Sequence, residues 1–278
     1  MDLASYKKMK DYLICVDSDG CAMDTMDIKH IRCFGPCMVT EWGLEEWKDE
    51  ILTRWNDINL YTMTRGINRF KGLAMALDEI NTKYTPIDGV ADLVKWADES
   101  PELSNAAVEK AIEATGADVF KKALSWSKAV NESINALPFE EKKPFEGVKE
   151  GLAYAHELAD IVIVSSANLQ AVEEEWELYG LLDHVDLLMS QNYGSKAFCI
   201  GEMLKKGYDK DKVFMCGDAP GDFDAAKKND VYYYPILVRH EKESWAEFRS
   251  TAVQKLLDGE FGGAYQEEKI QQFLDNLK

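Results

Sequence analysis

A short apolar run that ends in two acids is the feature that most constrains this chain. The run YLICV, at residues 12–16, is typical of a strand buried on both faces. Asp17, Ser18, Asp19 and Gly20 follow at once, so the strand ends where glycine lets the chain turn. Asp17 and Asp19 lie two positions apart, which predicts that both carboxylates point into one pocket at the carboxyl edge of a sheet. Carboxylates that close repel each other unless a cation or a shared proton compensates, so the sequence predicts a functional site here.

The charge balance and the lengths of the apolar runs limit the partners that we expect. Lys and Arg number 32 against 50 Asp and Glu, a net charge of -18, which argues against nucleic acid but not against a small phosphorylated ligand. No apolar run approaches the roughly 20 residues of a membrane helix, and the N-terminus lacks a signal-peptide layout. We therefore expect a cytoplasmic protein, away from membranes, whose six cysteines are reduced thiols. The sequence does not indicate an oligomeric state.

Helical periodicity dominates residues 25–139. Apolar residues recur at helical spacing over 44–60, 66–80 and 117–137. Ser104 is placed to cap a helix that stops at Gly116, and Asp88 is placed to cap the helix before it. The block contains no convincing strand, and its tryptophan-rich stripes are typical of a core. We therefore expect a helical domain with its own core.

Strands and helices alternate from residue 140 to the end of the chain. Short apolar runs at 161–164, 185–189, 213–216 and 231–237 are separated by helical segments. This alternation predicts a parallel sheet covered on both faces, and the strand at 12–16 needs that sheet for its partners. We predict an α/β fold, in which a Rossmann-like doubly wound parallel sheet core (1–24 and 140–278) carries an inserted all-helical domain (25–139).

Further polar residues follow the other strands of the predicted core. In a doubly wound sheet, ligands bind outside the carboxyl ends of the strands. The second strand delivers Ser165 and Ser166 just before a helix, where hydroxyl and free N–H groups form an anion site. The third strand is followed by Lys196, and the fourth by Asp218 and Asp222. Oxygen-only ligands predict Mg²⁺, and with one lysine they make the set that phosphoryl transfer requires.

These segments resemble, in order, the four motifs of the haloacid dehalogenase-like (HAD) hydrolase superfamily. The matching features are DSDG after the first strand, a serine after the second, a downstream lysine, and GDxxxD after the fourth. The helical insert resembles the C1-type cap of that family. Cys21 stands where the family usually has threonine, and Ala22 replaces a larger apolar residue.

The resemblance implies a role for each acid. Asp17 would be the nucleophile that becomes an aspartyl-phosphate, and it would also bind Mg²⁺. Asp19 would protonate the leaving oxygen, then activate water, and lend its backbone carbonyl to the metal. Asp218 would be the side-chain metal ligand. Asp222 would hold a metal-bound water or the lysine.

The resemblance also implies how the phosphate would be held. Ser165 would donate a hydrogen bond to the phosphoryl oxygens, while Ser166 would either join it or only cap the following helix. Lys196 would orient and neutralise both Asp17 and the phosphate.

An acid two residues after the nucleophile separates reactions within the family. Dehalogenases lack it because halide leaves without a proton, and phosphonate-cleaving members use a cap lysine instead. We therefore expect a Mg²⁺-dependent phosphatase of a small phosphorylated metabolite, with a sugar phosphomutase and a non-catalytic phosphate-binding protein as alternatives. Arg65, Arg69 and Lys71 would either meet a second anionic group of the substrate or be solvated helix-end charges.

Overall fold

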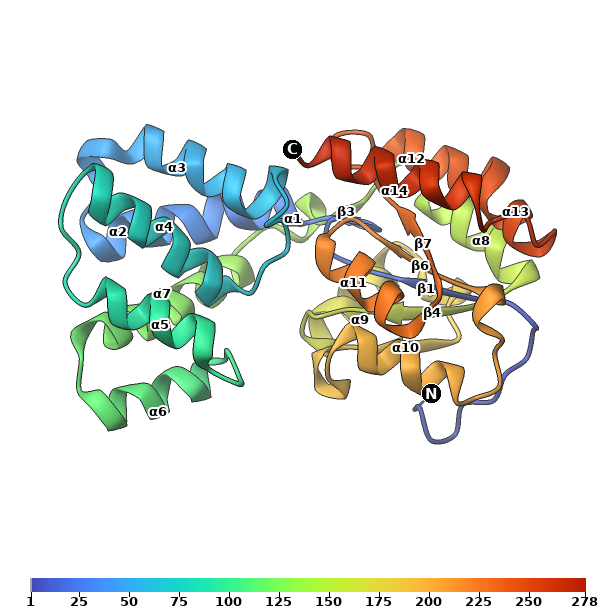
Figure 1. Ribbon diagram of the computed structural model, residues 1–278, viewed down its shortest axis with the longest axis horizontal. Coiled ribbons are helices and arrows are strands. Elements are labelled where there is room, and N and C mark those ends of the chain that lie inside the picture. Colours follow the sequence, from blue (N-terminus) through green and yellow to red (C-terminus); the bar gives the residue numbers. More distant parts are fainter. Residues whose placement is uncertain (1) are drawn as a thin grey trace. The chain divides into compact units, whose positions relative to one another are not determined.

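The computed structural model describes residues 2–278, and the chain divides into two compact units (Figure 1). Each unit has its own apolar core. The sheet unit comprises residues 2–26 and 139–278, and the helical unit comprises Asp27–Pro138. The predicted fold class is confirmed, because one unit contains a parallel five-stranded sheet with helices and the other consists of helices.

The five strands of the sheet are all parallel and follow the order β5-β4-β1-β6-β7. Their bounds are Leu13–Val16 (β1), Asp160–Val164 (β4), Leu187–Met189 (β5), Val213–Gly217 (β6) and Tyr232–Pro235 (β7). The central strand, β1, is fully buried, which explains its unbroken apolar run. Val16 is in register with Ile163 of β4 and Cys216 of β6, so the residues that follow these three strands meet at one edge.

Helices cover both faces of this sheet. They are α8 (Val148–Leu158), α9 (Leu169–Leu178), α10 (Lys196–Leu204), α11 (Pro220–Asn229), α12 (Glu241–Glu247), α13 (Val253–Leu257) and α14 (Ala264–Asn276). On one face, Phe214 of β6 lies with α8 and with Trp245 of α12 in a single apolar cluster. On the other face, the ring centroid of Tyr233 lies 5.2 Å from that of Phe273 on α14 and 5.3 Å from that of Phe223 on α11.

The structure adds a two-stranded antiparallel ladder that the sequence did not predict. It pairs β2 (Met23–Asp24) with β3 (Lys143–Pro144), in the two segments through which the chain leaves and re-enters the sheet unit. Each strand has only two residues, too few to give a period of alternation.

The helical unit is built around an aromatic core. Its helices are α1 (Met26–Lys29, which begins in the sheet unit), α2 (Gly35–Trp42), α3 (Lys48–Asn56), α4 (Arg69–Lys83), α5 (Val90–Glu99), α6 (Asn105–Thr115) and α7 (Asp118–Asn135). Trp55 and Trp126 are fully buried with their ring centroids 6.1 Å apart, so the tryptophans form a core as expected. Ser104 caps α6, which ends at Gly116, as predicted. The prediction for Asp88 was wrong, because Gly89 occupies the N-cap of α5 with a φ of 76°.

Two expectations about thiols and membranes can be compared with the structure. All six cysteines are free thiols, and five of them are buried. Over residues 2–278, no helix combines the length and the apolar character needed to cross a membrane.

Candidate active site

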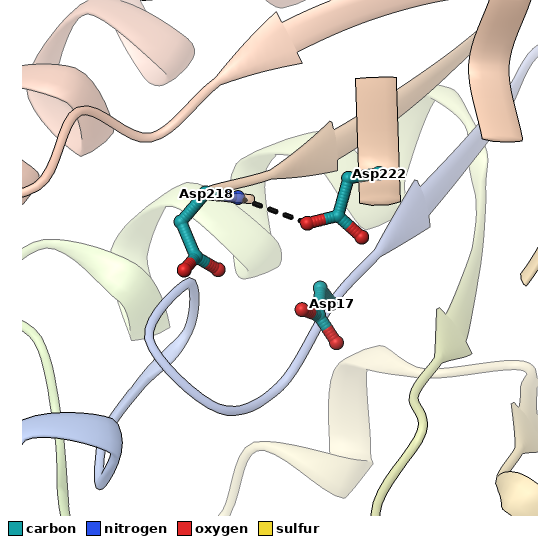
Figure 2. Close-up of side chains that lie close together, drawn as sticks. All are labelled: Asp17, Asp218 and Asp222. Atoms are coloured by element: carbon teal, nitrogen blue, oxygen red, sulfur yellow. Dashed lines mark hydrogen bonds between the residues drawn. The ribbon is translucent and has the colours of Figure 1, made fainter. Parts of the chain in front are cut away.

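The carboxyl edge of the sheet gathers three acids in one place. Asp17 follows β1 directly, and Asp218 and Asp222 follow the neighbouring β6 (Figure 2). The backbone N–H of Asp17 donates to the carbonyl of Cys216 at 2.9 Å, which fixes the nucleophile candidate against β6. All three side chains are buried, and one ligand oxygen from each lies within 4.8 Å of the others. Acids from two neighbouring strands thus meet within the reach of a single cation.

Lys196, the first residue of α10, joins two of these acids. Its Nζ lies 2.6 Å from Asp17 Oδ2 and 2.6 Å from Asp222 Oδ1. Burial lowers the pKa of Lys196, but the two carboxylates outweigh that effect and raise it above its usual value. The lysine therefore stays charged at neutral pH and holds Asp17 in one orientation.

Asp222 is occupied by donors from its own turn. Its Oδ2 accepts the N–H group of Asp218 at 3.2 Å (Figure 2). The same Oδ2 accepts the N–H of Ala219 at 3.0 Å, while its Oδ1 faces Lys196. This close approach requires glycine at position 217, because a Cβ there would lie 2.3 Å from the Cγ of Asp222. With three donors in place, Asp222 is better suited to orient Lys196 and the turn than to bind a metal.

The charges of this cluster do not balance by themselves. Three carboxylates and one ammonium carry two net negative charges when all are ionised. Burial, together with the charges of Asp222 and Asp218, raises the pKa of Asp17 well above its usual value, although Lys196 opposes this rise. Oxygen ligands with a double negative charge fit Mg²⁺, and Asp17 and Asp218 are the two acids best placed to hold it.

Asp19 stands apart from the acidic cluster. Its side chain is partly buried, and its Oδ1 accepts a 2.5 Å hydrogen bond from the hydroxyl of the buried Thr25. The turn between them is closed by the N–H of Gly20, which donates to the carbonyl of Met23 at 2.8 Å. Asp19 is therefore held in a defined position two residues after Asp17, and its side chain is not part of the cluster of Asp17, Asp218 and Asp222.

The two candidate phosphate-binding serines have different surroundings. Ser165 follows β4, which pairs with β1, and its side chain is buried. The Oγ of Ser165 accepts the N–H of Ala167 at 3.1 Å, and the backbone N–H of Ser165 donates to the carbonyl of Met189 at 2.9 Å. Ser166 is exposed, and the cap of α9 is provided by Asn168, whose side chain accepts the N–H groups of residues 170 and 171. The alternative that Ser166 caps the helix is therefore wrong.

Of the three basic residues that the sequence singled out in the helical unit, Arg65 and Arg69 make defined contacts, and Lys71 is partly buried. Arg65 is buried and donates to the carbonyl of Leu60. Arg69 lies over the ring of Phe34 and donates to Ser127 and Asn131. Both guanidinium groups thus make bonds inside the helical unit, so the alternative of solvated helix-end charges is wrong for these two residues. That either residue meets a substrate anion stays a prediction.

The sequence did not point to Thr25, and it did not show why residue 217 is glycine. Thr25 lies six residues beyond Asp19, and only the turn between them brings the hydroxyl to the carboxylate. Gly217 is the first residue of the GDxxxD motif, but the reason that no side chain fits there follows only from the position of Asp222.

A family described as haloacid dehalogenase-like hydrolases has a model that matches residues 77–234, more than half of the chain. The matched segment contains Ser165, Lys196, Asp218 and Asp222, but it begins after Asp17 and Asp19. The chain finds no match among curated proteins.

Two solved structures resemble the fold over most of the chain. A haloacid dehalogenase-like family hydrolase from Streptococcus pneumoniae is 12% identical, with 89% of this chain and 97% of that chain covered and a TM-score of 0.53. A candidate phosphoglycolate phosphatase from Lactobacillus delbrueckii subsp. bulgaricus is 13% identical, with 81% and 85% covered and a TM-score of 0.51. At these identities the likeness is one of fold.

Proposed function

We propose that this chain, which belongs to the haloacid dehalogenase-like hydrolase family, is a Mg²⁺-dependent phosphatase of a small phosphorylated metabolite. The observation that carries the proposal is the pair of contacts around Asp17. Its carboxylate is fixed by Lys196 at 2.6 Å and lies with Asp218 in one buried acidic cluster. A carboxylate oriented by a cation and placed beside a metal site is suited to attack phosphorus.

The chemistry would take place in two steps on Asp17. In the first, an oxygen of Asp17 forms a bond to phosphorus while the ester P–O bond breaks, and Asp19 gives its proton to the leaving oxygen. In the second, Asp19 takes a proton from water, whose oxygen bonds to phosphorus as the bond to Asp17 breaks. Phosphate and the free carboxylate result, so atoms and charge balance.

The remaining groups would support both steps. Lys196 and the Ser165 hydroxyl neutralise and orient the phosphoryl oxygens. Mg²⁺, held by Asp17 and Asp218, supplies positive charge that offsets the carboxylates and the phosphate when it is bound. We also propose that the helical unit serves as a cap that selects the substrate.

Asp19 favours a phosphate ester over a halide as the substrate. An alcohol leaving group needs a proton, and a halide does not. The hydroxyl of Thr25 holds Asp19 Oδ1 at 2.5 Å, so the acid that would supply this proton is positioned by the protein.

Release of phosphate from p-nitrophenyl phosphate, with Mg²⁺ and after its removal by EDTA, tests this function. We expect turnover only with Mg²⁺, and its loss in Asp17→Asn. Asp224→Asn, which changes an exposed acid on α11, is the matched control and should retain wild-type turnover. Wild-type turnover by folded Asp17→Asn would refute the proposal.

Assays with a panel of phosphorylated metabolites would then distinguish a phosphatase from a phosphomutase. Release of free phosphate supports a phosphatase. Conversion of a sugar phosphate to its isomer without release of phosphate would identify a phosphomutase instead.

A further inference from the structure

Ser18, the residue between Asp17 and Asp19, is held by a tryptophan from a distant part of the chain. Its Oγ accepts a 2.9 Å hydrogen bond from Nε1 of Trp176, which lies on α9. Both side chains are fully buried. The buried indole N–H thus finds its acceptor in the buried hydroxyl of the residue that separates the two acids.

The backbone of Ser18 is the anchor of the turn that carries these acids. Its carbonyl accepts the N–H groups of Ala22 at 3.0 Å and Met23 at 2.8 Å, and its own N–H donates to Asp17 Oδ1 at 2.8 Å. A shift of Ser18 would therefore move one oxygen of Asp17 and the start of the turn together. Because the Ser18 side chain is bonded to α9, Trp176 restrains both.

α9 also follows the segment that would bind phosphate. It begins at Leu169, four residues after Ser165, and Trp176 lies two turns into it. One rigid helix therefore connects the Ser165 segment to the turn of Asp17. An apolar pair at positions 18 and 176 could fill the same space, but it would not fix the direction of the Ser18 side chain.

We propose that Trp176 is a positioning residue for the reaction, which acts through Ser18 to hold the Asp17 carboxylate against the phosphate-binding segment. This inference rests on the proposed phosphatase function and deepens it. Misplacement of a reacting group by about 1 Å can cost about 100-fold in rate. Loss of this one hydrogen bond, with the surrounding core retained, should lower kcat about tenfold.

The Trp176→Phe variant removes the indole N–H and keeps an aromatic ring in the core. With p-nitrophenyl phosphate and Mg²⁺, we expect kcat to fall about tenfold, while KM and the inhibition constant of inorganic phosphate stay within about twofold. Tyr12→Phe is the matched control. It removes a hydrogen bond of 2.9 Å to the carbonyl of Leu257 at the opposite end of β1, and it should leave kcat unchanged.

The double variant shows whether Trp176 acts through Ser18. Ser18→Ala should also lower kcat about tenfold, and Ser18→Ala with Trp176→Phe should lose no more than either single change. Losses that multiply to about 100-fold would overturn this route, as would a Trp176→Phe enzyme with wild-type kcat or with a raised KM alone. If Trp176→Phe does not fold, Ser18→Ala decides by the same criteria. Failure of the wild type to cleave any phosphate ester would instead refute the proposed function itself.

Discussion

Replacing Gly217 by alanine tests how tightly the acidic cluster is built. The new Cβ would lie 2.3 Å from the Cγ of Asp222 and 2.5 Å from its Oδ2, whereas real Cβ atoms stay beyond 3.0 Å. Asp222 must therefore withdraw by at least about 0.7 Å, the difference between 2.3 and 3.0 Å. Its bonds to the N–H groups of Asp218 and Ala219, now 3.2 and 3.0 Å, would then become too long.

The cost of this displacement can be estimated for both stability and rate. Overpacking of this kind lowers the free energy of unfolding by about 1–3 kcal/mol, and each kcal/mol lowers Tm by roughly 2–4 °C in a domain of this size. Because Asp222 also orients Lys196, whose Nζ is 2.6 Å away, we expect kcat to fall by about 10- to 100-fold.

Thermal unfolding and p-nitrophenyl phosphate turnover, measured on the same samples, provide the assay. Gly221→Ala is the matched control, because a Cβ there meets nothing within 4 Å and the residue lies in the first turn of α11. It should keep Tm or raise it slightly and retain kcat. A Gly217→Ala protein with wild-type Tm and kcat would refute the reasoning that Asp222 must stay in place.

Three further changes test other parts of the account. Tyr208→Phe removes a buried hydroxyl that donates to Asp160 at the start of β4, so the free energy of unfolding in urea should fall by about 1–3 kcal/mol with kcat unchanged. Lys196→Met removes the cation between Asp17 and Asp222, and steady-state assays should show at least about a 100-fold loss of kcat. The pKa of Asp17 is raised above its usual 3.8 in the folded protein. Without metal, Asp17 therefore stabilises the fold fully below pH 3.8, and this stabilisation is lost as the pH rises through the raised pKa. Since Mg²⁺ binds the ionised carboxylate, the rise in Tm caused by Mg²⁺ should grow as the pH rises through the raised pKa of Asp17. A rise in Tm that does not depend on pH would contradict this.

The sequence was most informative where burial leaves a simple pattern. The strand at residues 12–16 is an unbroken apolar run because β1 lies at the centre of the sheet, and the helix that Ser104 caps was predicted because its cap is local. The helical character of residues 25–139 was predicted, but the bounds of α1 and α2 and the π-helical turn between them were not. Nor were β2 and β3, which depend on pairing between segments about 120 residues apart. Local patterns carry no information about such a pairing.

The residues of the candidate site likewise include some that the strand pattern predicts and one contact that only the fold shows. Asp17, Lys196, Asp218 and Asp222 each follow a strand, so the parallel topology alone predicts that they converge, and the structure brings these four together. Their catalytic roles stay predictions. Trp176 reads from sequence as an ordinary core residue of a helix, and its bond to Ser18, 158 positions away, appears only in the fold.

Chemical trapping of the phosphorylated enzyme tests the central claim most directly. Wild-type protein would be mixed with a phosphate ester and Mg²⁺, quenched in acid, and treated with borohydride, which reduces an aspartyl-phosphate to homoserine. Peptide mass spectrometry should find homoserine in place of Asp17, and only when ester and Mg²⁺ are both present. Turnover of the ester with Asp17 unmodified, or with homoserine at another aspartate, would contradict the account.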